Sequence, residues 1–107
     1  MKDPQHIVDE GRRLWNEGKY WHVHEELEQL WLVRKGKEKD LLQGLILVAA
    51  SLVHAGNKKW EVVWPMMERA LKKLDDQPDL YYSWDIAKFR DHFARVLKSK
   101  KLEIPTV

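Results

Sequence analysis

One long apolar stretch, LLQGLILVAASLVHA from Leu41 to Ala55, sets the first limit on the fold. Read at 3.6 residues per turn, it is apolar nearly all round, which a helix at the protein surface cannot be. It is shorter than the roughly twenty apolar residues that span a bilayer, and Gln43 and His54 interrupt it. We therefore expect a buried central helix over about residues 38–55, and we expect no membrane segment.

Helix start and stop signals surround this stretch. Asp3 before Pro4 is typical of a helix start, because the carboxylate caps the first turn and proline needs no amide partner there. Gly18 and Gly36 are placed to end the first and second helices. Pro65 lies inside the fourth predicted helix and should kink it or split it in two.

Later signals define the remaining boundaries. Gly56 and Asn57 indicate the end of one helix and the start of the next, and Ser83 is expected to cap the last helix. No period-two alternation bounded by turns and no internal repeat occurs, and the tail from Lys98 onward is expected to fray. The prediction is an all-α, single-domain bundle with helices over about residues 4–17, 20–35, 38–55, 58–75 and 84–98.

Composition narrows the location and the class of partner. The 107 residues include no cysteine, so a disulfide framework, a thiolate metal site and a cysteine nucleophile are excluded, and a cytoplasmic location is expected. Nineteen Lys and Arg against seventeen Asp and Glu give a formal net charge of +2. Both signs are interspersed and no nucleic-acid-binding module is recognisable, so nucleic-acid binding is not expected.

Polar residues fall on apolar stripes of the second and third predicted helices. In YWHVHEELEQLW, residues 20–31, His24 lies within the stripe of Tyr20, Leu27 and Trp31, and Glu28 lies at its edge. On the next helix, Gln43 and His54 share one face. If these helices pack antiparallel, one inward cluster is expected, with Glu25 at its margin; its members are His24, Glu28, Gln43 and His54.

Two interpretations of this cluster remain open. In the first, Glu28 accepts hydrogen bonds from the imidazoles and Gln43 completes a buried polar core that fixes which helix faces meet. In the second, His24, Glu28 and His54 are a ligand set suited to Zn or Fe(II), with Glu25 as a candidate general base. The leading hypothesis is thus a non-enzymatic interaction or scaffold domain. The alternative is a metal-binding or metal-dependent enzyme.

Four short motifs between Trp15 and Asn57 carry a family resemblance: WNEGKY, HEELEQLW, LQGLI and HAGN. Together they resemble an uncharacterised all-helical family, domain of unknown function 309. The resemblance implies a multihelical bundle whose activity is unassigned. By position, the family's His-Glu pair and its following Glu correspond to His24, Glu25 and Glu28, and its first Gln to Gln43. The family's second Gln is Leu47 here, so one polar contact of the family's interior is missing.

Six tryptophans are many for a chain of this length. Trp15, Trp21 and Trp31 are expected to line the core. Trp60 and Trp64 lie one turn apart and precede Met66, so this stretch either packs into the core or forms an exposed patch for a protein partner or a second copy of the chain. His6, His22 and His92 are expected at the surface.

Overall fold

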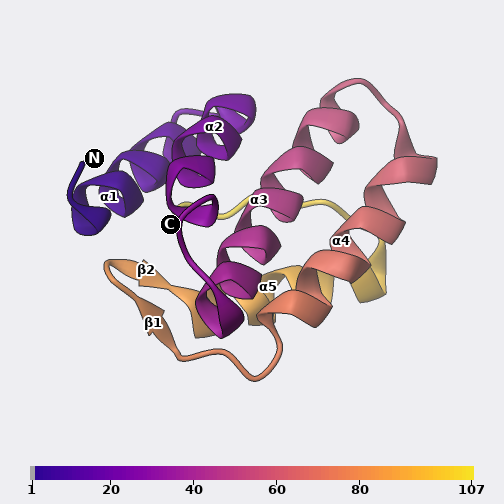
Figure 1. The fold of residues 1–107 in the computed structure, drawn as a ribbon. Coiled ribbons are helices and arrows are strands. Elements are labelled where there is room, and N and C mark those ends of the chain that lie inside the picture. The colour runs from indigo at the N-terminus through magenta and orange to yellow at the C-terminus, as the bar shows by residue number, and fades with distance from the viewer. Residues whose placement is uncertain (1) are drawn as a thin grey trace.

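The computed structural model describes residues 2–107 and contains five helices and one short hairpin (Figure 1). The helices are α1 (Pro4–Asn16), α2 (Tyr20–Trp31), α3 (Gly36–Gly56), α4 (Trp60–Leu74) and α5 (Ile86–Ser99). The hairpin joins β1 (Leu80–Tyr81) to β2 (Trp84–Asp85), with Tyr81 opposite Trp84. The predicted all-α class is confirmed, and the described chain adds only this two-stranded ribbon to it.

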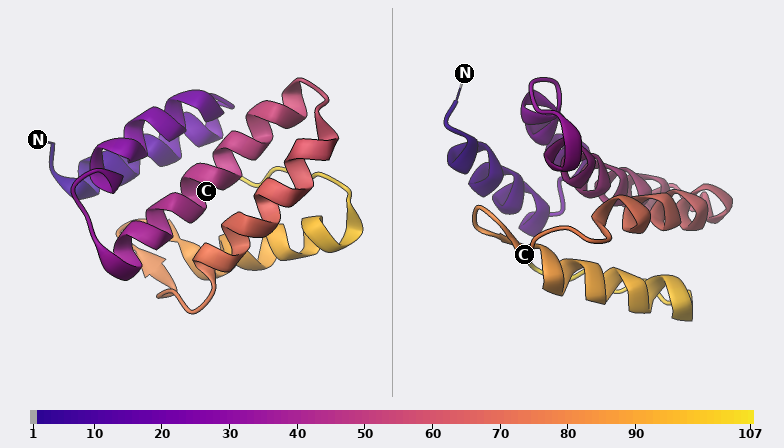
Figure 2. Two further views of the ribbon diagram at one scale, coloured as in Figure 1. Left: turned by 45° about the vertical axis from the view of Figure 1, so that its right-hand side comes forward. Right: turned by 60° about the horizontal axis from the view of Figure 1, so that its bottom comes forward.

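Helix α3 is the centre of the bundle, as its sequence predicted. It packs against α2 on one side and α4 on the other, while α1 lies on α2 and α5 lies on α4 (Figures 1 and 2). Its fully buried residues include Leu42, Leu45, Val48 and Ala49. By length and composition α3 could also span a membrane, but the core helix of a compact fold passes the same test, and half of the apolar window is buried here.

A close contact between α3 and α4 depends on Gly44. A Cβ atom added at this position would lie 2.7 Å from the Cγ and Cδ2 atoms of Leu74 and 3.1 Å from the carbonyl oxygen of Ala70. The α4 side of this contact is the stripe Val63, Met67, Ala70 and Leu74, all fully buried. The helices can therefore meet this closely only because residue 44 has no side chain.

The ends of the helices follow the predicted signals in part. The Asp3 side chain accepts a hydrogen bond from the amide of Gln5 and Pro4 begins α1, whereas Gly18 follows α1 at a φ of +77°. Helix α2 ends at Trp31 rather than Lys35, and Gly36, with a φ of +65°, begins α3 instead of ending α2.

Pro65 does not split α4, which runs through it as one helix. The amide that proline lacks would have bonded the carbonyl of Glu61, one turn earlier. Glu61 lies in the exposed first turn of α4, where water can bond a free carbonyl, so the lost bond costs less there than in a buried helix interior.

The last helix starts later than predicted, because Asp85 and not Ser83 is its cap. The Asp85 carboxylate accepts from the amide of Lys88 at 2.9 Å, while Ser83 lies in the hairpin turn and donates to Asp9. The hairpin places Trp84 inside, where its ring centroid lies 6.0 Å from that of Trp15 and 5.5 Å from that of Phe89. Two-residue strands carry too little alternation to be predicted from sequence.

Three hydrogen bonds tie the hairpin and the loop before it to α3 and α4. The buried Tyr81 hydroxyl donates to Glu38 at 2.7 Å, and burial together with this bond raises the pKa of Tyr81 above its usual range. Gln77 donates to the carbonyl oxygens of Lys37 and Lys73 at 3.0 and 3.1 Å. These bonds hold the loop after α4 against the start of α3.

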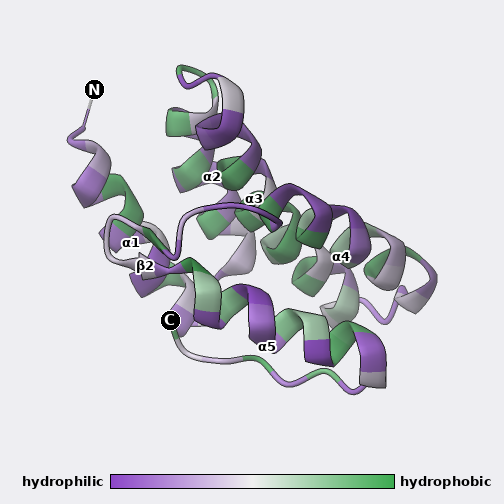
Figure 3. Cartoon of the chain, turned by 90° about the horizontal axis from the view of Figure 1, so that it is seen from below, coloured by the Kyte–Doolittle hydropathy of each residue, from purple (hydrophilic) through white to green (hydrophobic). Residues whose placement is uncertain are grey.

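The tail does not fray as predicted. Residues 101–107 have no helical or strand assignment, yet they run back along α5 to α1 (Figures 2 and 3). Leu102 and Val107 pack against the core, and the Trp15 indole donates to the carbonyl of Pro105 at 2.7 Å. The expectation of fraying was wrong because these half-buried apolar residues and main-chain bonds offset the entropy that the tail loses.

The glycine contact between α3 and α4 gives a stability test. We expect Gly44→Ala to lower the free energy of unfolding by about 1 to 3 kcal/mol, because the new methyl group must displace Leu74 and the α4 backbone. Gly56→Ala is the matched control: it adds the same methyl group to the same helix, but into open space. It should be neutral or should stabilise the protein by up to about 1 kcal/mol. Urea unfolding measures both, and equal effects would contradict the close packing at residue 44.

Candidate functional site

The predicted polar cluster is not assembled in the structure. The inward stripe of α2 is Val23, Leu27 and Leu30, which are fully buried, so the stripe proposed from Tyr20, Leu27 and Trp31 was rotated away from the true one. His24 lies at the edge of the inward stripe as a result. Residues spaced i, i+4 and i+7 share a face, and α1 and α3 both pack on this aliphatic face.

The glutamates of the HExxE motif are at the surface. The Glu28 side chain is 44% exposed and its nearest cation is His24, whose Nε2 lies 3.5 Å from Glu28 Oε2. Glu25 is 58% exposed and pairs with His22 Nδ1 at 3.1 Å. Neither carboxylate is a buried acceptor, so the expected hydrogen-bonded brace between α2 and α3 is not formed through them.

The three nitrogen-bearing members of the predicted set have different neighbours. His24 stacks on Trp21 of its own helix, with ring centroids 5.0 Å apart. Gln43 lies with Leu47 in a groove of about 270 Å³ whose other lining residues, Arg69, Lys72 and Lys73, come from α4. His54 is in the last turn of α3.

The described residues therefore do not form a metal-ligand set at these positions. Across residues 2–107, no three His, Asp or Glu side chains lie close enough together to hold one ion. The predicted Zn or Fe(II) set of His24, Glu28 and His54 is one of the sets that the fold does not bring together. Along α2, Glu28 is 44% exposed, whereas His24 is only 26% exposed and its Nδ1 is buried without a hydrogen-bond partner.

The buried polar groups that the structure does contain are different ones. Within the described part of the chain, Ser51 and Gln77 are buried, as is Tyr81 with its hydroxyl group. The Ser51 hydroxyl donates to the carbonyl of Val48 at 2.6 Å, and Gln77 donates to two carbonyls as described above. Ser51 and Gln77 thus satisfy backbone carbonyls, while the buried Tyr81 hydroxyl donates to Glu38 and the buried His24 Nδ1 has no hydrogen-bond partner.

The tryptophans divide between core and surface. Trp15 and Trp84 are buried among aromatic rings, Trp31 and Trp64 are partly buried, and Trp21 is 54% exposed, so its predicted place in the core was wrong. Trp60 is 40% exposed and stacks on Trp64, with ring centroids 5.5 Å apart and 21° between the ring planes. Within the predicted patch, Trp60 is therefore exposed, whereas Trp64 is partly buried against the core.

The family model described as "Domain of unknown function (DUF309)" matches residues 8–66, just over half of the chain. This chain belongs to the DUF309 family. The match runs from the middle of α1 into α4 and includes the HExxE segment, Gln43 and His54. The match ends within α4, so the hairpin, α5 and the tail lie outside the part of the chain that the family model covers.

One relative of this DUF309 chain is an uncharacterized protein from Aquifex aeolicus (strain VF5). It is 26% identical over 100 residues, which are 92% of this chain and 30% of that protein. The chain therefore spans less than a third of the length of this relative. No solved structure matches the chain significantly.

Sequence reasoning missed the residues that hold the tail. Arg12, Asn16 and His92 all bond main-chain atoms of residues 103–107, and His92, expected at the surface, is half-buried by this contact. Pro105 was the available signal, because the residue before a proline favours an extended backbone that a groove can bind. By contrast, His6 and His22 are exposed as predicted.

The exposed position of Glu28 makes a direct test of the site geometry. We expect Glu28→Gln to change the free energy of unfolding by no more than about 0.5 kcal/mol, because a solvated i, i+4 pair contributes little. Chemical denaturation at neutral pH measures the change. A loss of about 2 kcal/mol or more would mean that Glu28 is a buried acceptor after all, which would restore the polar-core interpretation.

Proposed function

We propose that this protein is a non-enzymatic interaction domain that binds an acidic protein partner through a tryptophan surface, formed by Trp60, Trp64 and Lys100. The observation that carries the proposal is the stacked pair Trp60 and Trp64, whose outer indole is exposed on the first turn of α4. Tryptophan is among the residues that contribute most to binding energy when a partner covers it.

The packing of the core supports this assignment. The inward stripe of α4 is Val63, Met67, Ala70 and Leu74, which fills the contact with α3 without help from Trp60. Trp64 packs partly against the core and fixes the orientation of Trp60 through stacking. Trp60 is therefore a rigid apolar group held in place at the surface, which lowers the entropy that a partner must offset on binding.

Charge around the tryptophan surface favours an acidic partner. Lys58 and Lys59 directly precede Trp60, and the Lys100 Nζ lies 5.2 Å from the centroid of the Trp64 ring. Glu61 is the acidic residue in the first turn of α4. A second copy of the chain would bring the same lysines against one another, so this surface suits a different protein better than itself.

Met66, grouped with the two tryptophans by sequence, does not belong to this surface. It follows Trp64 by two residues, which places it about 200° around the helix axis. It is half-buried there.

The length of the Aquifex aeolicus relative also supports an interaction role, since a segment similar to this chain is less than a third of that protein. The absence of cysteine supports a cytoplasmic location as part of the same proposal.

The proposal predicts that binding depends on Trp60 and not on exposed tryptophan in general. A photoreactive residue placed at Glu61 in the full chain should crosslink one protein in cells that express it, and mass spectrometry identifies that protein. Purified, it should bind the wild-type chain and bind Trp60→Gln at least about tenfold more weakly, as expected for loss of a central anchor. Trp21→Gln, which removes a more exposed indole on α2, should leave the affinity unchanged.

Two outcomes would contradict the proposal. A partner whose affinity is the same for Trp60→Gln and wild type would place the contact elsewhere. Sedimentation equilibrium that shows a dimer of the wild-type chain, abolished by Trp60→Gln, would mean that the surface binds a second copy instead of an acidic partner. Circular dichroism melts of both variants serve as the folding control, because neither indole is part of the buried core.

A further inference from the structure

The tail segment, residues 102–107, lies in a groove between α1 and α5 and is held there by its main chain. Its carbonyl oxygens at Glu103, Pro105 and Val107 all accept hydrogen bonds from side chains of the groove. The donors and distances are His92 Nε2 to residue 103 at 2.6 Å, Trp15 Nε1 to residue 105 at 2.7 Å, and Arg12 Nη2 to residue 107 at 2.9 Å. We call the set Arg12, Trp15, Asn16 and His92 the α1–α5 groove.

The spacing of these bonds is that of an extended chain. Successive carbonyl groups of an extended backbone point to opposite sides, so the carbonyls of residues 103, 105 and 107 face the same way. Arg12, Trp15 and Asn16 lie three and four residues apart and thus share one face of α1, while His92 comes from α5. The two helices together present a row of donors at the repeat of an extended peptide.

Asn16 completes the recognition with two opposed bonds to one residue. Its Oδ1 accepts from the amide of Val107 at 2.7 Å and its Nδ2 donates to the carbonyl of Val107 at 3.2 Å. A neighbouring β-strand satisfies an extended residue with the same donor and acceptor pair. Each bond that the α1–α5 groove makes to the tail ends on a main-chain atom, so it does not require the tail's own side chains.

The tail contributes only a modest apolar contact in return. Leu102, Pro105 and Val107 are half-buried, whereas Glu103, Ile104 and Thr106 are exposed. A segment held by few buried side chains opens at a small fraction of the cost of global unfolding. The tail can therefore exchange with another extended segment that makes the same main-chain bonds.

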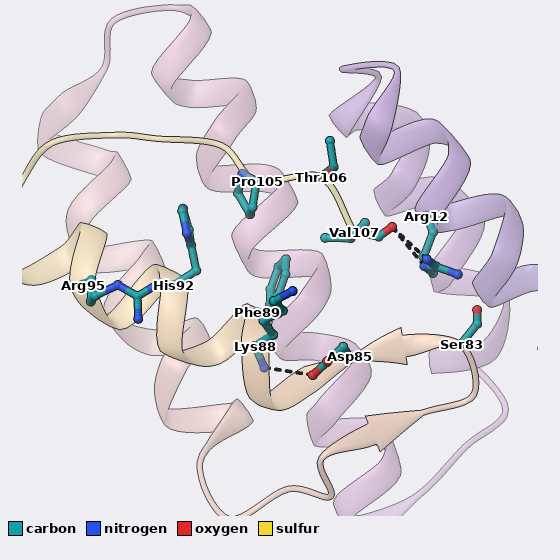
Figure 4. A pocket seen from close by; sticks show the side chains of 10 residues that line it. All are labelled: Arg12, Ser83, Asp85, Lys88, Phe89, His92, Arg95, Pro105, Thr106 and Val107. Atoms are coloured by element: carbon teal, nitrogen blue, oxygen red, sulfur yellow. Dashed lines mark hydrogen bonds between the residues drawn. The ribbon is translucent and has the colours of Figure 1, made fainter.

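A cavity beside the tail favours acidic side chains in such a segment. It has a volume of about 590 Å³ and lies between α5, the hairpin, Arg12 and residues 105–107 (Figure 4). Its charged lining residues are Arg12, Lys88, Arg95 and Asp85, and the Asp85 carboxylate already accepts from the Lys88 amide. Thr106 also lines the cavity, so a carboxylate at this peptide position would lie among cationic groups.

We propose that the α1–α5 groove is a binding site for an extended, proline-containing segment of another protein, with an acidic residue at the position of Thr106. The tail segment occupies the groove in cis and competes with that partner. The two sites share no residue, since the groove residues lie on α1 and α5 and the two tryptophans lie on α4; Lys100 of the tryptophan surface precedes the tail segment in the chain. Failure of one proposal therefore leaves the other standing.

The test uses the full chain with its own tail weakened. Leu102→Gly, Pro105→Gly and Val107→Gly together remove the apolar anchors of the tail and raise its entropy while the groove stays intact. The probe is a fluorescent peptide of residues 100–107, labelled at its amino end and with the Val107 carboxylate free as in the 107-residue chain under test, and fluorescence anisotropy measures its affinity. We expect saturable binding to this tail variant and binding at least about tenfold weaker to the wild-type chain, whose tail competes at high effective concentration.

Three matched comparisons identify what the groove recognises. Adding Asn16→Ala to the tail variant should weaken the peptide by about tenfold, whereas Asn57→Ala, at the end of α3, should have no effect. Methylation of the peptide nitrogen at the Val107 position removes the N–H that bonds Asn16 and should weaken binding by a similar factor. Glutamate at the Thr106 position should tighten binding about three- to tenfold, an advantage that high salt removes.

The outcomes are decisive in both directions. The absence of peptide binding to the tail variant at millimolar concentration, or equal binding of the methylated and unmethylated peptides, would overturn the proposal. If the tail variant fails to fold, the wild-type chain is titrated with the glutamate peptide and followed by NMR. The Trp15 indole N–H and the Asn16 side-chain amide should then shift, and unchanged resonances at millimolar peptide would overturn the proposal equally.

Discussion

The close approach of α3 and α4 at Gly44 is the contact on which the rest of the structure depends. It lets the stripe Val63, Met67, Ala70 and Leu74 cover one side of the most apolar helix, while Val23, Leu27 and Leu30 of α2 cover the other. Helix α1 and the hairpin then close the end of the bundle through the aromatic rings around Trp15 and Trp84. A larger residue at position 44 would separate α3 from α4 and leave both apolar stripes partly open to water.

An interior filled in this way determines where chemistry can occur. The buried positions are taken mainly by aliphatic and aromatic side chains; the buried Ser51 and Gln77 bond backbone carbonyls, and the buried Tyr81 hydroxyl bonds Glu38. The glutamates of the family motif lie at the surface, with Glu25 58% and Glu28 44% exposed. We propose recognition as the role of this arrangement, through two surfaces: the tryptophan surface with its basic border, and the α1–α5 groove, which bonds the main chain of the tail.

The sequence predicted those features that one strong local signal determines. The apolar character of α3 identified the central helix, Asp3 and Pro4 identified the start of α1, and the motifs from Trp15 to Asn57 identified the family. Two apolar stripes are possible on α2, and the aliphatic one of Val23, Leu27 and Leu30 is the buried one. Turning α2 to bury Tyr20 and Trp31 would also bury His24 and Glu28. Their loss of hydration would cost more free energy than burial of the two aromatic rings would gain.

The features that were missed depend on contacts distant in sequence. The docking of residues 103–107 requires the end of α1 to meet α5, where Trp15 packs on Phe89 and Phe93, and the two-residue strands of the hairpin are stabilised by Trp84 packing on Trp15. The most direct test of the central role of α3 is native-state hydrogen exchange of the whole chain. The account predicts that the amides of Leu45, Val48 and Ala49 exchange only through global unfolding, with a free energy equal to that from chemical denaturation. If these α3 amides exchanged at a lower free energy than the buried amides of α1 or α5, α3 would not be the core of the fold.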